Sequence, residues 1–202
     1  MRILRSRDYP VLAWKNGLGV SHVIASQPQR AGYDTALWQV GTTSIEASCP
    51  FSDLPGLDRQ FMVLEGEGVE LHCRVASGDP DLRRRIDAPF EPFAFRGDWQ
   101  TECRLLGGPV RVFNVVTRRG CFVAEVSVST SGNSIALEKA AAESLLVFVV
   151  EGAIHIEGCS VSLAMNDAMI ADGPEPERYS INGTSARVVI VRLTKVRPIA
   201  GQ

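Results

Sequence analysis

Cationic, amide and indole side chains gather in three stretches of this sequence. The first contains Trp14, Lys15 and Asn16, the second contains Trp38, and the third ends at Arg59. An asparagine amide has two donors and an acceptor, a lysine is a compact positive charge, and the planar arginine fork can hold a carboxylate at two points. The two tryptophans can line an apolar pocket. These residue types suit a carboxylate or amide ligand.

Each of these residues also has a structural interpretation. Arg59 can pair with Asp58, with Asp53 or with a turn carbonyl. Asn16 precedes Gly17, and Asn-Gly is a common turn sequence. The tryptophans can be core residues. The sequence leaves these alternatives open.

The three histidines do not have the spacing of a metal site. His22, His72 and His155 lie far apart, and none has a second histidine nearby in the sequence. A divalent metal needs several imidazole, thiolate or carboxylate ligands close together. We therefore expect no metal and no other cofactor, with a site assembled from three distant histidines as the open alternative.

Nucleophilic catalysis has little support. The sequence contains no Gly-x-Ser-x-Gly elbow. Cys73 follows His72 directly, but successive side chains of a strand point to opposite faces. We assign no catalytic residue and favour a protein that is not an enzyme. The five cysteines include no CxxC pair, and their odd number argues against a disulfide framework. We expect reduced thiols and a cytoplasmic location.

The composition is that of a globular protein. The chain has 202 residues, of which 45% are hydrophobic and 22% are charged, and its net charge is -2. A nucleic-acid surface needs clustered positive charge, so we expect no nucleic-acid partner. The longest aliphatic and aromatic run, Leu145–Val150, is far shorter than the ~20 residues that span a bilayer, and we expect no membrane association.

Strand patterns dominate the chain. Val69–Val75 and Phe122–Val128 alternate apolar and polar residues, and Gly, Pro, Asp and Asn separate such segments every 8–12 residues or so. Leu137–Glu143 contains good helix formers and can be a short helix or a crossover. The pattern predicts an all-β protein.

An internal repeat divides the chain. Phe61–Gly66 matches Val147–Gly152, and both segments end in Glu-Gly. A glycine at this point supplies the positive φ of a tight turn, so we expect a hairpin in each copy. The repeat predicts two fused copies of one β-domain, with chance similarity as the alternative.

The segments that follow the second Glu-Gly resemble the cupin pattern of short strands joined by Gly and Asn-Asp turns. This resemblance implies a bicupin, with two tandem jelly-roll (double-stranded β-helix) barrels in one chain. The expected barrels cover residues 10–120 and 121–195. The His-x-His pair that cupin enzymes use to hold a metal is missing.

Four ordered motifs resemble the HutD/Ves family of bacterial bicupins, many of which are associated with histidine utilisation. The motifs begin at Trp14, Trp38, Pro50 and Val112, and the last contains Asn114 and ends in Arg118-Arg119-Gly120. The resemblance implies seven ligand-binding residues, which are Trp14, Lys15, Asn16, Trp38, Arg59, Asn114 and Arg118. The pair Arg118-Arg119 has an open structural interpretation at a strand end.

The sequence departs from the family pattern at several polar positions. The departures are Leu18, Ser21, His22, Val23, Gln39, Val112 and Val116. Either the ligand differs from that of other members, or these positions are structural.

The family resemblance implies a non-catalytic accessory or regulatory protein of histidine breakdown. Its expected ligand is a carboxylate intermediate such as formylglutamate, whose two carboxylates match the cationic candidates; urocanate is the alternative ligand. Two other functions stay open, a cupin-type enzyme (an isomerase or a metal-dependent oxygenase) and a protein-interaction module. A homodimer formed through an edge strand is a further expectation, because unpaired edges favour pairing.

Overall fold

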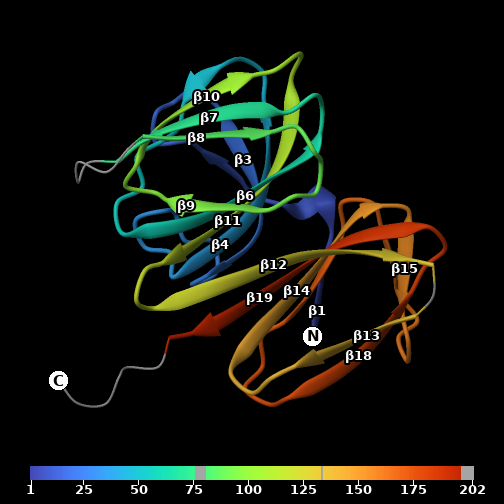
Figure 1. Cartoon of the computed structure of the whole chain (residues 1–202). Helices are drawn as coiled ribbons and strands as arrows, with labels where there is room; N and C mark the ends of the chain where they lie inside the picture. The colour runs from blue at the N-terminus through green and yellow to red at the C-terminus, as the bar shows by residue number, and fades with distance from the viewer. Residues whose placement is uncertain (76–80, 133, 197–202) are drawn as a thin grey trace, which may run out of the picture. The chain divides into compact units, whose positions relative to one another are not determined.

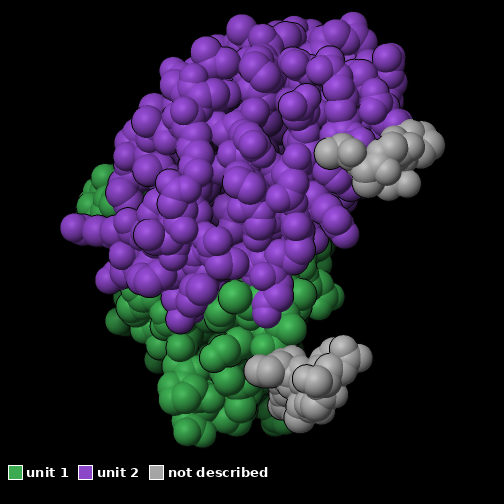
Figure 2. Space-filling model, turned by 90° about the vertical axis from the view of Figure 1, so that its left-hand side faces the viewer, with its two compact units in different colours: residues 1–9, 121–202 green, residues 10–120 purple. Residues whose placement is uncertain are grey.

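Antiparallel strands make up almost all of the regular structure in the computed structural model, which describes residues 1–75, 81–132 and 134–196 (Figure 1). The chain divides into two compact units, residues 10–120 and residues 1–9 with 121–202, which Figure 2 colours separately. The all-β prediction is confirmed. The described residues contain no helix that is long and apolar enough to cross a lipid bilayer.

The unit of residues 10–120 contains two sheets. The six-stranded sheet has the order β2-β3-β4-β11-β6-β9, and the four-stranded sheet has the order β5-β10-β7-β8. The strands are β2 (Val11–Ala13), β3 (Val20–Gln27), β4 (Trp38–Ile45), β5 (Cys49–Pro50), β6 (Leu57–Glu65), β7 (Val69–Arg74), β8 (Leu82–Ile86), β9 (Phe93–Arg96), β10 (Gln100–Leu105) and β11 (Val110–Arg118).

Side-chain alternation builds the core of this unit. In β7, Val69, Leu71 and Cys73 are fully buried, whereas the residues between them are partly exposed. They join one apolar cluster with residues of the other sheet, among them Phe61 and Val112. The two-residue period of a strand therefore turns one face of each sheet toward a shared core.

The unit of residues 1–9 and 121–196 also contains two sheets, with the orders β1-β17-β14-β19-β12 and β13-β18-β15-β16. The 3₁₀ helix η1 (Ser6–Asp8) follows β1. The strands are β1 (Arg2–Leu4), β12 (Phe122–Ser131), β13 (Ile135–Lys139), β14 (Glu143–Glu151), β15 (Ala153–Ile156), β16 (Ser162–Ala164), β17 (Ala168–Ala171), β18 (Glu177–Asn182) and β19 (Ala186–Lys195).

Both units contain the same eight-strand pairing order. Strands β4–β11 pair as β4-β11-β6-β9 and β5-β10-β7-β8, and strands β12–β19 pair as β12-β19-β14-β17 and β13-β18-β15-β16. Each strand of the first series therefore has a counterpart eight strands later. Two sheets of four strands each are the arrangement of a jelly roll.

The repeated Glu-Gly segments are corners between sheets, and the expectation of hairpins is wrong. Gly66 (φ 101°) leads from β6 in one sheet to β7 in the other, and Gly152 (φ 71°) leads from β14 to β15 in the same way. The glycine gives the chain a sharp turn, but the flanking strands do not pair with each other. Leu137–Glu143 is not a helix, because its residues belong to β13, a turn and the start of β14.

The first nine residues belong to the unit formed by the C-terminal half of the chain. β1 pairs with β17 in antiparallel register. Asp167, which is buried, accepts hydrogen bonds from Arg5 Nη1 at 2.6 Å, from the Ser6 N–H at 3.0 Å and from the Ala164 N–H at 3.2 Å. One carboxylate thus joins the N-terminal segment to the loop before β17.

We expect Asp167→Asn to lower the free energy of unfolding by about 2 kcal/mol at neutral pH, because the amide loses the charge that strengthens these bonds. Burial alone would raise the pKa of Asp167, but the hydrogen bonds from Ser6, Arg5 and Ala164 outweigh it and lower the pKa. A carboxyl group whose pKa is lowered by folding stabilises the folded state at pH values above its unfolded pKa. This stabilisation is lost as the pH falls through the folded pKa.

Urea unfolding at pH 7 and at low pH tests this expectation. The difference between wild type and Asp167→Asn should shrink on acidification. Asp8→Asn is the control, because Asp8 is 70% exposed in its side chain and lies 3.9 Å from Arg7. Equal losses in the two variants would contradict the role given to Asp167.

Candidate functional site

A cavity lies on the inner face of the six-stranded sheet in the unit of residues 10–120. Its volume is about 40 Å³, well below the ~300–1,000 Å³ of pockets that enclose a whole drug-sized ligand. The polar lining residues are Ser21, Tyr33, Gln39, Thr43, Ser52, Arg59 and Asn114. The others are Trp14, Gly41, Ile45, Phe51, Leu54, Phe61 and Val116.

Strand register explains why distant residues meet here. Val116 of β11 lies opposite Arg59 of β6, and Asn114 lies opposite Phe61. On the other side of β11, the partners of Val116 and Asn114 in β4 are Gln39 and Gly41. Residues two apart in a strand share a face. Strands β4, β11 and β6, which are neighbours in Figure 1, therefore present one continuous wall.

Arg59 is a half-buried cation to which the described residues offer no anionic partner. Its guanidinium lies over the Phe51 ring at 4.7 Å and over the Phe95 ring at 4.9 Å. Its Nε is buried and has no hydrogen-bond partner among the described residues, which also supply no ion pair to Arg59. The pairing with Asp58 that the sequence left open is absent, because Asp58 binds Arg119 at 2.9 Å.

Burial lowers the pKa of Arg59 to about 10, although the nearby Tyr33 phenol acts in the opposite direction. Desolvation penalises the charged form of a base, and the two aromatic rings replace only part of the lost hydration. A ligand carboxylate on Arg59 would supply the missing countercharge. The geometry therefore favours an anionic ligand.

Asn114 is the second unsatisfied polar group of the cavity. Its Oδ1 is buried and has no hydrogen-bond partner within the described parts of the chain. A buried acceptor without a donor costs free energy. The Asn114 amide can turn either its oxygen or its NH₂ group toward a ligand. Arg59 and Asn114 thus offer a charged donor and an amide on one wall.

A cluster of hydroxyl groups occupies another part of the lining. Ser21 Oγ lies 2.7 Å from Thr43 Oγ1 and 3.4 Å from the Tyr33 hydroxyl, and Trp14 Nε1 donates to it at 3.0 Å. Trp14 also packs against the core of this unit. These contacts hold the Trp14 ring as a fixed wall.

Two predicted residues in the first motif lie outside the cavity lining. Lys15 forms an ion pair with Asp34. The Asn16 side chain donates to the Pro50 carbonyl at 2.8 Å and accepts from the Leu18 N–H at 3.1 Å. The structure therefore gives Asn16 the turn role that the sequence left open, and it ties the turn to the segment that precedes Phe51.

Trp38 and Arg118 are also outside the lining. Trp38 is 2% exposed, and its Nε1 donates to Gln27 Oε1 at 2.8 Å. The Arg118 guanidinium donates to three carbonyl oxygens, at 3.0 Å to Ala36, 3.2 Å to Tyr33 and 2.9 Å to Asp34. Its donors are used to hold the segment that carries Tyr33. Of the seven predicted residues, the cavity brings together Trp14, Arg59 and Asn114.

Arg118→Ala should loosen the segment of residues 31–37, because three carbonyl oxygens lose their common donor. We expect hydrogen exchange of the amides of Thr35 and Ala36, which both bond to Gly32, to become at least tenfold faster. Arg104→Ala is the control, since Arg104 forms an exposed pair with Glu70. Unchanged exchange in Arg118→Ala would show that the segment holds without it.

Several lining residues were missed by the site prediction. Phe51 and Ser52 lie inside the third family motif, and Ser21 and Gln39 are departures from the family pattern. The sequence therefore contained a feature that could have identified these four residues as part of the site. Tyr33 and Thr43 carried none, because each reaches the cavity only through strand register and chain reversal. Among the other departures, Val116 lines the cavity, Leu18 is 57% exposed and Val112 is a core residue.

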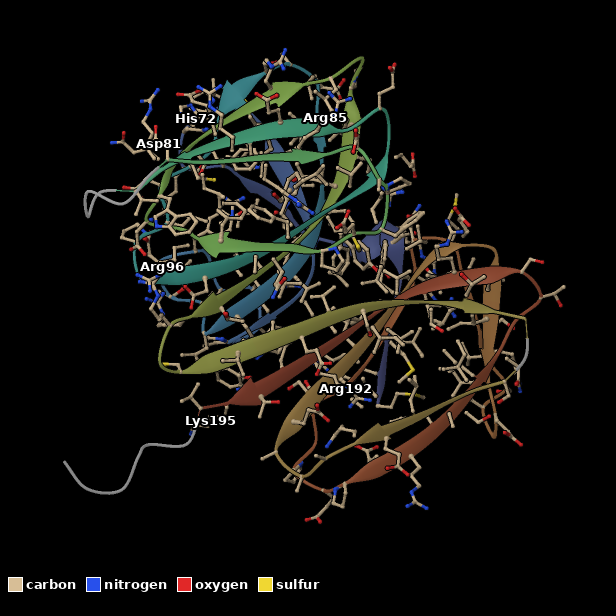
Figure 3. All side chains as sticks on the ribbon, in the orientation of Figure 1. His72, Asp81, Arg85, Arg96, Arg192 and Lys195 are labelled. Carbon is tan, nitrogen blue, oxygen red and sulfur yellow. The ribbon has the colours of Figure 1, made fainter. Side chains whose placement is uncertain are left out.

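The described residues contain no group of three His, Cys, Asp or Glu side chains that could hold a metal ion. His72 is instead 2.9 Å from Asp81, and Figure 3 labels both residues, with His72 on β7 and Asp81 just before β8. The absence of a cofactor stays a prediction.

Comparisons with known proteins agree with the order of the motifs. The family model described as HutD matches residues 6–189. An uncharacterised 21.2 kDa protein from the hutC 3′ region of Pseudomonas putida is 38% identical over 116 residues, and this alignment spans 57% of each chain. HutD from Pseudomonas fluorescens SBW25 is 28% identical, with a TM-score of 0.79 over 98% of this chain and 99% of that one.

A more distant structure, Ylba from E. coli, shares the fold alone. Its identity is 8%, and its TM-score is 0.68 over 98% of this chain and 92% of that one. This likeness and the order of the antiparallel sheets support a cupin-like β fold. Within that class, the match over residues 6–189 is specific, and the chain belongs to the HutD family.

Proposed function

We propose that this protein binds a small carboxylate in the cavity at Arg59 and acts, without turnover, as an accessory or regulatory protein of histidine utilisation. The observation that carries the proposal is the Arg59 guanidinium, which has a buried Nε and no ion-pair or hydrogen-bond partner among the described residues. Membership of the HutD family and the relative beside hutC support the link to histidine utilisation.

The proposal includes a bicupin architecture. It is supported by the two eight-strand series that pair in the same order, β4–β11 and β12–β19. In this proposal the ligand cavity belongs to the N-terminal barrel. The homodimer and the cytoplasmic location remain predictions from the sequence.

Formylglutamate is the proposed ligand. One of its carboxylates would bind Arg59, and its formamide is a neutral donor and acceptor that matches the Asn114 amide. Apart from Arg59, Tyr33 is the one described lining residue whose side chain is of a type that usually exchanges protons in catalysis. The enzyme alternative therefore has less support.

A thermal-shift panel tests the proposal against its rivals. It would contain histidine, urocanate, formiminoglutamate, formylglutamate, glutamate and divalent metals. A ligand at about 100 times its Kd adds roughly 2.7 kcal/mol to the stability, which raises Tm by about 5–10 °C. A shift with formylglutamate and none with metals supports the proposal. A shift with metals alone would favour the enzyme, and no shift at all would favour the interaction module.

A further inference from the structure

The donors and acceptors of the hydroxyl cluster can be assigned one by one. Thr43 Oγ1 donates to the Val20 carbonyl at 3.0 Å, so its hydrogen is used. Ser21 must therefore donate to Thr43 across their 2.7 Å contact, while it accepts from Trp14. Because the single hydrogen of Ser21 is committed, the 3.4 Å contact with Tyr33 requires the phenol to donate.

This last bond is the weak one in the cluster. An ordinary O–H···O bond is about 2.7–2.8 Å long, and 3.4 Å is well beyond it. Tyr33 therefore has a loosely held donor, whereas the hydrogens of Ser21 and Thr43 are held at short range. Within this cluster, the Tyr33 phenol is the hydroxyl that can turn to a ligand at the smallest cost.

Tyr33 is also fixed close to Arg59. Its ring packs against Leu54, Leu57 and Val116, and Arg118 holds its backbone carbonyl. Val116 is the register partner of Arg59, and the Tyr33 phenol contributes to the electrostatic environment of that guanidinium. A carboxylate bound to Arg59 is therefore near a phenol with an available hydrogen.

The charges of the lining limit how many anionic groups can enter. Arg59 is the one charged side chain among the residues that line the cavity in the described chain. Lys15 is neutralised by Asp34, and the Arg118 donors are bonded to carbonyl oxygens. One positive charge can balance one carboxylate, and a second buried anion would have no partner.

From these observations we infer that the cavity holds a single carboxylate between Arg59 and Tyr33, and that the rest of the ligand inside it is uncharged and polar, with an amide facing Asn114. This inference rests on the proposed carboxylate site and narrows its ligand class. A dicarboxylate binds through one of its two acids, and the other acid gains nothing from the cavity.

Half-amides of formylglutamate test the inference, since they keep its size and remove one charge. N-formylglutamine lacks the side-chain acid, N-formylisoglutamine lacks the α-acid, and the diamide lacks both. We expect calorimetric titration to give one half-amide a Kd within threefold of that of formylglutamate, and to give the diamide a Kd at least 30-fold weaker. If both half-amides bind at least 30-fold more weakly than the diacid, the single-carboxylate inference is wrong while the proposed function stands. If none of the four compounds binds, both fail.

Tyr33→Phe tests the phenol directly. Loss of a hydrogen bond to a charged group should weaken the better half-amide about tenfold or more and leave the weak diamide unchanged. Tyr179→Phe, in the other unit, is the matched control and should bind as wild type does. A Kd for Tyr33→Phe within twofold of the wild-type value would remove Tyr33 from the carboxylate site.

Discussion

Arg59→Met is expected to weaken carboxylate binding strongly and to make the ligand-free protein more stable. The substitution removes the one charged group of the lining and keeps a long, flexible side chain between the two rings. Removing one side of a buried, hydrogen-bonded ion pair costs about 2–5 kcal/mol of binding. We therefore expect the Kd for formylglutamate to rise by at least 30-fold.

The gain in stability follows from the lowered pKa of Arg59. A pKa of about 10, against an ordinary value of about 12.5 or above, means that the fold disfavours the charged form by about 3 kcal/mol. Two cation–π contacts and partial exposure of the residue offset much of this cost. The remaining gain is about 1 kcal/mol, or roughly 2–4 °C in Tm.

The pH dependence has a definite sign. A base whose pKa is lowered by folding destabilises the folded state fully at every pH below the folded pKa. For Arg59 this destabilisation decreases as the pH rises from about 10 toward the pKa of the unfolded state. At neutral pH the full difference between wild type and Arg59→Met should be present. Arg104→Met, at an exposed ion pair, should change neither affinity nor Tm. An Arg59→Met protein that still binds the ligand would place the site elsewhere.

Gly66→Ala should be far more damaging than Gly152→Ala, although the two glycines occupy the same place in the repeat. A Cβ on Gly66 would lie 2.6 Å from the Pro109 carbonyl oxygen, at a φ of 101°. A Cβ on Gly152 would meet its nearest atom, Ala186 Cα, at 3.2 Å, and its φ of 71° lies in the left-handed region. Positive φ strains both variants, but Gly66→Ala must also displace backbone at a contact of 2.6 Å, whereas Gly152→Ala needs a shift of only a few tenths of an ångström.

We expect a loss of about 3–5 kcal/mol for Gly66→Ala and of about 1–2 kcal/mol for Gly152→Ala. Urea unfolding followed by circular dichroism measures both. Gly56→Ala is a control for positive φ alone, because its Cβ would meet no atom within 4 Å. Equal losses in Gly66→Ala and Gly152→Ala would contradict the close approach at Pro109.

The strands could be predicted because alternation is a local property. Val69–Val75 showed its buried face in the sequence itself, and the structure has β7 there. The Glu-Gly repeat also marked equivalent positions correctly as turns. It could not show whether the flanking strands pair, because a hairpin and a corner between sheets both need a glycine with positive φ. That choice is made by the neighbours of β6, which are β11 and β9.

The sequence identified a cavity residue only where a suitable side chain also lies at a position that faces the cavity. Arg59 and Asn114 lie on inward positions of β6 and β11, so their polar atoms reach the cavity. Lys15 and Arg118 have equally suitable side chains, but Asp34 and the carbonyls of residues 33–36 take up their donors. Such partners come from a distant loop, and no local pattern in the sequence identifies them.

The central claim is binding without turnover at Arg59, and proton NMR of formylglutamate mixed with the protein tests it most directly. With wild type, the ligand signals should broaden and shift, and their integrals should stay constant over a day. With Arg59→Met, the signals should match those of the free ligand. Identical spectra with both proteins would contradict binding at Arg59, and new product signals with wild type would contradict a non-catalytic function.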